Sequence, residues 1–197
     1  MKRFKLLGVT VPTVGLIVLA LFLFVGGATG GDNAKMRWDI VSINFATGTV
    51  NPGGHASARA EDDSRITLTG SGTFRSNSGN PQDVTGGGIW STSGPAGTGS
   101  GTYTVTGFVD FDVAPGVFPL TTDNIGAKED IRAGLVVLQI AYSDGSDGIL
   151  VVSCHLLGTP DSVFEGITAS KGFVDYWNHE KAVPAVDANR TAFHVLK

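Results

Sequence analysis

Two apolar runs, LVVLQIAY at 135–142 and ILVVSCHL at 149–156, decide the fold of this chain, and SDGSDG at 143–148 joins them. Their content of β-branched and aromatic residues is typical of strands. Glycine, serine and aspartate dominate the joining segment, as they do in tight turns. The sequence therefore predicts an antiparallel hairpin at this place.

Alternation along a strand sorts the residues of this hairpin onto two faces. A three-residue loop at 145–147 brings the even-numbered residues of both runs onto one fully apolar face. Cys154 belongs to that face, where we expect it to be a small buried residue. The other face carries Gln139, with Ser153 opposite it, and His155, which makes these three the polar cluster on otherwise apolar strands.

The polar cluster has two interpretations. Buried polar side chains usually satisfy one another, so Gln139, Ser153 and His155 can be structural. They can also be ligand-binding residues in the mouth of a barrel, with His155 as a catalytic general acid-base. We do not expect His155 to activate Cys154 as a nucleophile, because the side chains of neighbouring residues on a strand point to opposite faces. We predict no metal site and no cofactor, since the histidines at 55, 155, 179 and 194 lack metal-ligand spacing.

Further strand-like runs with turn-rich segments between them extend this pattern along the chain, and they occupy residues 37–46, 65–75, 84–91, 101–113 and 167–177. Short strands at such spacing predict an all-β fold, an antiparallel β-barrel of about seven to eight strands, with a β-sandwich as the alternative. Residues 192–196 can add a terminal strand. Thr159 followed by Pro160 resembles a helix start, which predicts one short helix ending near Gly166. We expect the aromatic-rich segment 173–180 to pack in the core.

A Gly-x-Gly-x-aromatic pattern occurs three times, at 70–74, 86–90 and 99–103. Residues two apart share a face of a strand, so each copy places two glycines and one ring on the same side. On neighbouring strands, a ring from one copy can cover the bare glycines of the next. We favour this packing role over an aromatic platform for a flat ligand.

The first 30 residues have the layout of an export signal. Three basic residues precede an uncharged run at 6–25, and small residues follow it. Cleavage gives a secreted protein, whereas retention of residues 6–25 gives a transmembrane helix and a membrane-anchored protein. Both readings place the remainder outside the cytoplasm. The expected organisation is a signal peptide or anchor at 1–30, a glycine-rich β domain at 31–180 and a polar tail at 181–197.

Composition excludes several classes of function. The chain has a net charge of −4 and the export segment is basic, so the remainder is more acidic still and nucleic-acid binding is disfavoured. A single cysteine rules out an internal disulfide. Glycine provides 28 of 197 residues, about twice the usual ~7%, which fits many tight turns.

Three functions remain. The leading hypothesis is an exported, non-enzymatic domain that binds a small ligand or a cell-surface partner, because strands are abundant and catalytic motifs are absent. The first alternative is a small β-barrel enzyme, an isomerase, cyclase or hydrolase that uses His155 as acid-base. The second alternative is a structural protein that self-associates through strand edges.

Overall fold

The computed structural model describes residues 34–76, 80, 82–183 and 188–197. These residues form an all-β molecule whose only helical element is a short 3-10 turn, η1 (Lys128–Asp130). No helix within the described ranges has the length and apolar character needed to cross a membrane. The predicted signal or anchor at 1–30 lies outside the described residues.

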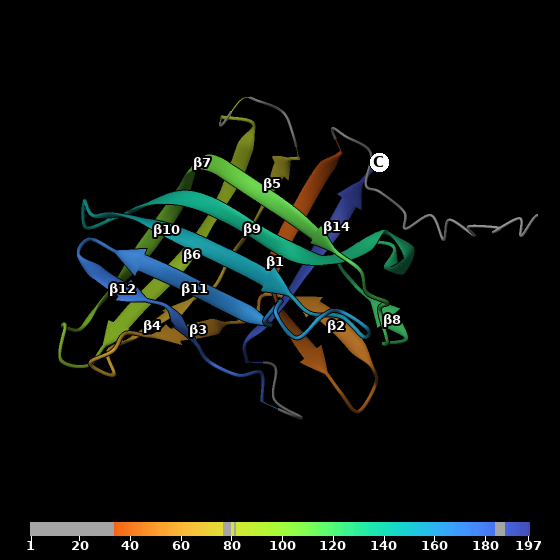
Figure 1. The fold of residues 1–197 in the computed structure, drawn as a ribbon, viewed down its shortest axis with the longest axis horizontal. Coiled ribbons are helices and arrows are strands. Elements are labelled where there is room, and N and C mark those ends of the chain that lie inside the picture. The colour runs from red at the N-terminus through yellow and green to blue at the C-terminus, as the bar shows by residue number, and fades with distance from the viewer. Residues whose placement is uncertain (1–33, 77–79, 81, 184–187) are drawn as a thin grey trace, which may run out of the picture.

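Six strands close into an antiparallel barrel (Figure 1). Going round the barrel, each strand pairs with the next and the last pairs with the first, in the order β1 (Lys35–Asn44), β5 (Ser71–Arg75), β6 (Val84–Ser93), β7 (Gly99–Ala114), β9 (Ile131–Tyr142) and β14 (Arg190–Leu196). The predicted all-β antiparallel barrel is confirmed, but the predicted number of about seven to eight strands is not: six strands form the closed ring, and further strands are attached to it.

The attached strands extend from two long barrel strands, because β6 and β9 each have room for two partners along one edge. From β6 the sheet continues through β4 (Arg65–Leu68), β3 (Ala56–Arg59) and β13 (Asn178–His179). From β9 it continues through β10 (Asp147–Cys154), β11 (Gly166–Lys171) and β12 (Val174–Tyr176). On the edge of β1 lie β2 (Thr49–Pro52) and, parallel to β2, β8 (Thr122–Asp123).

All seven strand-like runs of the sequence contain strands, and two of them are interrupted. The run at 65–75 divides into β4 and β5 at Gly70, and the run at 167–177 divides into β11 and β12 near Gly172. Both glycines have positive φ, 147° and 57°, which side chains disfavour. Residues 190–196 form β14, so the chain beyond the predicted boundary at 180 completes the barrel.

The hairpin of β9 and β10 forms as predicted, but its predicted register is wrong. Gln139 lies opposite Ile149, and Cys154 lies opposite Gly134. The Asp144 side chain accepts hydrogen bonds from the backbone and the hydroxyl of Ser146, which centres the turn earlier in the chain than expected. The observed register differs from the predicted one by an even number of residues, so the same side chains still share the apolar face. Cys154 on this face is completely buried.

A ring from one copy of the repeated pattern covers glycines of the next copy, as predicted, and a ring outside the pattern covers two further strand glycines. A Cβ added to Gly101 would lie 3.0 Å from Nε1 of Trp90, and one added to Gly99 would lie 3.1 Å from the same ring. Gly72 and Gly86 face each other across β5 and β6, and the Trp38 ring covers both. The glycines thus let bulky indole rings pack directly on the backbone of the barrel.

One local prediction is wrong, and another holds only in part. No helix forms after Thr159; its hydroxyl accepts the backbone N–H of Leu156 (3.0 Å) and donates to the carbonyl of Pro115 (2.8 Å). These bonds hold a turn against the end of β7. In the aromatic segment, Tyr176 is buried as expected, whereas Phe173 is fully exposed and Trp177 is 48% exposed, and these two residues flank the short strand β12.

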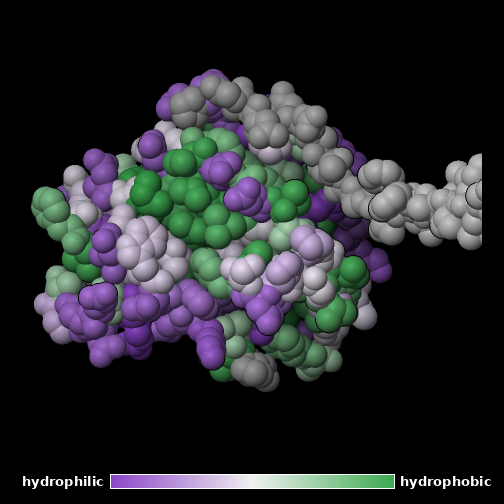
Figure 2. Space-filling view, viewed as in Figure 1, coloured by the Kyte–Doolittle hydropathy of each residue, from purple (hydrophilic) through white to green (hydrophobic). Residues whose placement is uncertain are grey.

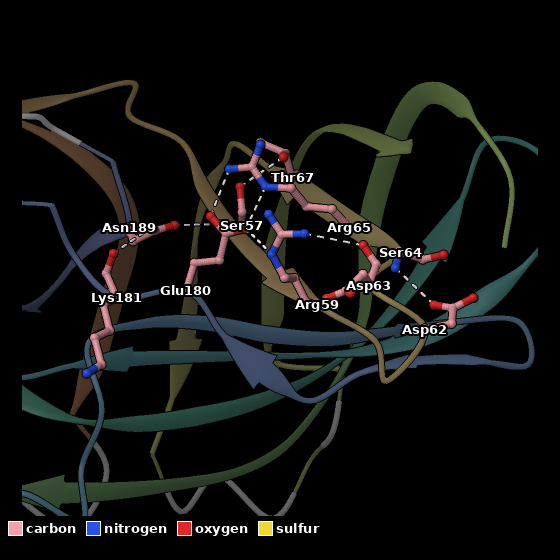
Figure 3. A network of polar contacts seen from close by, with 10 residues as sticks. All are labelled: Ser57, Arg59, Asp62, Asp63, Ser64, Arg65, Thr67, Glu180, Lys181 and Asn189. Carbon is pink, nitrogen blue, oxygen red and sulfur yellow. Dashed lines mark hydrogen bonds and ion pairs between the residues drawn. The ribbon is translucent and has the colours of Figure 1, made fainter. Parts of the chain in front are cut away.

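An ion-pair cluster ties the segment after β13 to the strands that extend from β6 (Figure 3). The two carboxylate oxygens of Glu180 accept bonds of 2.7 and 2.9 Å from the Arg65 guanidinium. Arg59 lies 3.1 Å from the same carboxylate. A bidentate pair of this kind fixes geometry as well as charge, so the chain is held in place as it returns towards β14.

Candidate functional site

The structure separates the three residues of the predicted polar cluster. Gln139 is exposed on the outside of the barrel, where Figure 2 shows a largely apolar area with scattered polar residues over β7, β9 and β10. Ser153 is completely buried, and its hydroxyl donates to the carbonyl of Phe164 (2.7 Å). His155 follows β10 and lines a pocket at one end of the barrel. Of the three residues, His155 alone lines this pocket, while Gln139 faces a separate hollow on the outer surface and Ser153 is inaccessible.

The His155 ring is held by its backbone surroundings. Its Nδ1 lies 2.7 Å from the carbonyl oxygen of Val163. A carbonyl only accepts hydrogen bonds, so Nδ1 carries the proton. In the neutral ring, Nε2 then keeps its lone pair and can accept a proton or a hydrogen bond.

A buried carboxylate that the sequence did not single out lies beside His155. Each oxygen of Glu165 accepts a backbone N–H, one from His155 (2.6 Å) and one from Thr191 (2.8 Å). The residue as a whole keeps some solvent exposure, whereas its carboxyl group is surrounded by protein. Burial raises the pKa of Glu165 to about 7, against the opposing effect of the two backbone hydrogen bonds and the Arg190 charge.

These contacts join three segments that are distant in the sequence. Glu165 links the end of β10 to the start of β14, and the Thr191 hydroxyl donates to the carbonyl of Ser153 (2.5 Å). Gly166 follows with a φ of 114°, a conformation that glycine alone adopts readily. The end of the barrel is thereby fixed around the carboxyl group.

The pocket at this end, here called the barrel-end pocket, has a volume of about 110 Å³. Several of its apolar lining residues are buried, among them Val50, Ile131 and Leu156, and form an apolar interior. Phe45 and Leu157 also line it and are 40% and 68% exposed. The remaining lining residues are Val41, Ile43, Phe118, Pro119, Leu120, His155, Glu165, Arg190, Thr191 and Ala192. The pocket thus combines an apolar wall with three ionisable side chains.

Arg190 is the cation of the barrel-end pocket. Its guanidinium carbon lies 5.4 Å from the centre of the Phe45 ring, within the range of a cation–π contact. Its Nε is buried and has no hydrogen-bond partner among the described residues. An unsatisfied buried donor costs about 1–3 kcal/mol, so a bound acceptor would stabilise this arrangement.

Asn189 sets the position at which Arg190 enters β14. It has a φ of 60°, and its side-chain carbonyl accepts the backbone N–H of Ser57 (2.7 Å). Its amide donates to the carbonyl of Lys181 (3.1 Å), so it bridges two segments, as Figure 3 shows. The arginine is therefore held by a fixed backbone.

A second ionisable cluster lies elsewhere, on the outside of β1 and β14 beneath the segment that follows β8. His194 Nε2 and Asp123 Oδ2 are 2.8 Å apart, and both side chains are almost fully buried. Nearby, Asp39 forms two hydrogen bonds with Arg37, and burial raises the pKa of Asp39 against the opposing effect of that arginine. None of these four residues lines the barrel-end pocket, so the cluster is out of reach of a ligand bound there.

Within the described ranges, no three His, Cys, Asp or Glu side chains are grouped to hold a metal ion. Comparisons with known protein families, with curated proteins and with solved structures found no match to this chain. The sequence offered no signal for Glu165 or Arg190, since each is a single charged residue beside an apolar strand. Their significance depends on the pocket that they share.

Proposed function

We propose that this chain is an exported, non-enzymatic β domain that binds a ligand outside the cytoplasm, and that the barrel-end pocket is its binding site. One observation carries the binding proposal: an apolar cavity with a few fixed polar groups lies at the end of a closed barrel. An apolar pocket with a few fixed polar groups has the chemical character of a small-molecule site, although its volume of about 110 Å³ is below the usual range of about 300–1,000 Å³. The export proposal is supported by the basic start and the uncharged run at 6–25.

The size of the cavity limits the ligand. An apolar cavity of about 150 Å³ accommodates benzene, and the barrel-end pocket has about 110 Å³. It therefore suits a short alkyl group, either a whole small ligand or the end of a longer one. The exposed apolar side chains of Phe45 and Leu157 lie where the outer part of a longer ligand would run.

A small β-barrel enzyme that uses His155 as acid-base is the second candidate. Its support is that His155 lines the pocket beside Glu165, whose pKa of about 7 suits proton transfer near neutral pH. Against it, both oxygens of Glu165 are engaged by backbone N–H groups, and the His155 ring is tied to Val163. These bonds fit a supporting role for both residues better than a catalytic one.

Filling the pocket tests the binding proposal. Ile43 lines the cavity, so Ile43→Trp should block it, while Ile89→Trp places the same indole on β6 at an exposed position away from the pocket. Calorimetric titration with two six-carbon probes, hexanoate and 1-hexanol, should show binding of at least one probe to the wild type and to Ile89→Trp. Binding should be lost in Ile43→Trp. Absence of binding to the wild type, or equal binding to Ile43→Trp, would refute the site.

His155→Ala separates the two candidates. Unchanged probe binding with reduced stability would leave His155 a structural role and favour the binding domain. N-terminal sequencing of the protein recovered from its host tests the export proposal: a start near residue 29 or 31 means secretion, and an intact first residue means a tethered protein.

A further inference from the structure

The barrel-end pocket holds a cation, and no carboxylate of the part of the chain that the structure describes pairs with it. The Arg190 guanidinium has no ion pair within the described residues, and its Nε is buried without a hydrogen-bond partner. Arg37, Arg59 and Arg65 show the usual arrangement in this molecule, since each pairs with a carboxylate at 2.7–3.1 Å. The Nε of Arg132 is also buried without a partner, but Arg132 does not line the barrel-end pocket. Arg190 is therefore the unpaired arginine that a ligand in this pocket could contact.

Glu165 does not neutralise Arg190, although both residues line the pocket. Its two oxygens accept the backbone N–H groups of His155 and Thr191 and are not paired with the guanidinium. Burial also raises the pKa of Glu165 to about 7, so near neutral pH the carboxyl group is protonated in a large fraction of molecules. The positive charge of Arg190 thus remains available to a bound anion.

We propose that the ligand of the barrel-end pocket is a short-chain carboxylate, with its carboxylate bound by Arg190 and its alkyl chain in the apolar interior. This inference rests on the proposed function and names the class of its ligand. The planar guanidinium presents its N–H groups in a fork that matches two carboxylate oxygens. Phe45 packs on Arg190 at the exposed side of the pocket, where the carboxylate of the ligand would bind. The alkyl chain would contact the apolar interior, which is lined by Val50, Ile131 and Leu156.

The charges around the pocket favour a single negative charge on the ligand. Among the described residues, Arg190 is the only arginine or lysine that lines it, and Glu165 is the one acidic residue. A phosphate dianion would lack a second cation and would face repulsion from Glu165 whenever that group ionises. A carboxylate monoanion fits the one guanidinium.

The test compares two probes that differ only in the head group. Hexanoate carries the carboxylate, whereas 1-hexanol offers the same chain length with a neutral hydroxyl. Calorimetric titration of the wild type should give a dissociation constant roughly tenfold lower for hexanoate, the gain typical of a hydrogen bond to a charged group. Arg190→Met should reduce this preference to about one. Arg75→Met removes an exposed arginine from β5 and should retain the preference.

The outcomes separate this inference from the proposed function. Equal binding of both probes to the wild type, or an unchanged preference in Arg190→Met, would overturn the carboxylate inference and leave the pocket as a binding site. Failure of both probes to bind the wild type would refute the pocket itself. The preference is the ratio of the dissociation constants of the two probes for the same protein. A variant that binds both probes more weakly to the same degree therefore keeps the same preference. Should Arg190→Met not fold, the preference of the wild type and the variant Arg190→Gln decide the question.

Discussion

Glu165 should make a contribution to the free energy of unfolding that decreases as the pH rises, and replacing Glu165 with glutamine should remove this contribution. Burial raises the pKa of Glu165 in the folded protein to about 7, from an ordinary value of 4.5. A carboxyl group with a raised folded pKa binds its proton more tightly in the folded state than in the unfolded state. Its contribution is therefore complete below pH 4.5 and is lost as the pH rises through about 7.

The size of the effect follows from the shift. At about 1.4 kcal/mol per pKa unit, the difference between 4.5 and about 7 corresponds to roughly 3–4 kcal/mol. This is an upper value, because the residue keeps some contact with solvent. Glutamine has almost the same shape but does not titrate. The free energy of unfolding of the wild type, relative to Glu165→Gln, should therefore fall by up to that amount between pH 4.5 and pH 8.

Urea unfolding followed by circular dichroism at several pH values in this range measures the difference directly. Glu129→Gln is the matched control, because it removes a carboxylate from an exposed position in η1. A difference between wild type and Glu165→Gln that stays constant with pH would show that burial does not dominate at this site. A difference that grows with pH would show that the backbone N–H groups of His155 and Thr191 stabilise the charged carboxylate more than burial opposes it.

Two further predictions concern stability alone. Trp38→Ala should lower the free energy of unfolding by about 3–5 kcal/mol, because Trp38 is fully buried over Gly72 and Gly86. Trp177→Ala is the control: this side chain is 48% exposed, so its loss should cost less than about 1 kcal/mol. Similar losses for the two variants in urea unfolding would contradict the packing described. His194→Ala removes the side-chain partner of the buried Asp123 carboxylate, which keeps only the backbone N–H groups of Ile125 and Gly126, and should cost about 1–3 kcal/mol. The double variant with Asp123→Ala should lose clearly less than the sum of the two single losses, and strict additivity would show that the pair does not interact.

The hairpin at 135–156 could be predicted from the sequence because its two strands are neighbours in the chain. Alternation correctly identified the face that buries Cys154, since face depends only on whether the residue number is even or odd. The register could not be predicted, because it depends on hydrogen bonds that Asp144 makes within the turn. As a result Gln139 lies opposite Ile149, and the expected contact with Ser153 does not form.

The sequence by itself determined the class of the molecule: short strands, tight turns, and glycines placed so that aromatic rings can cover them. These are properties of neighbouring residues, so composition and period are enough to show them. Only the tertiary structure decided where the barrel closes and where its pocket lies. Closure depends on the pairing of β14 with β1 and β9, and the pocket joins His155, Glu165 and Arg190, which no local pattern connects. A charge beside an apolar strand acquires its chemical role only when distant segments bury it together.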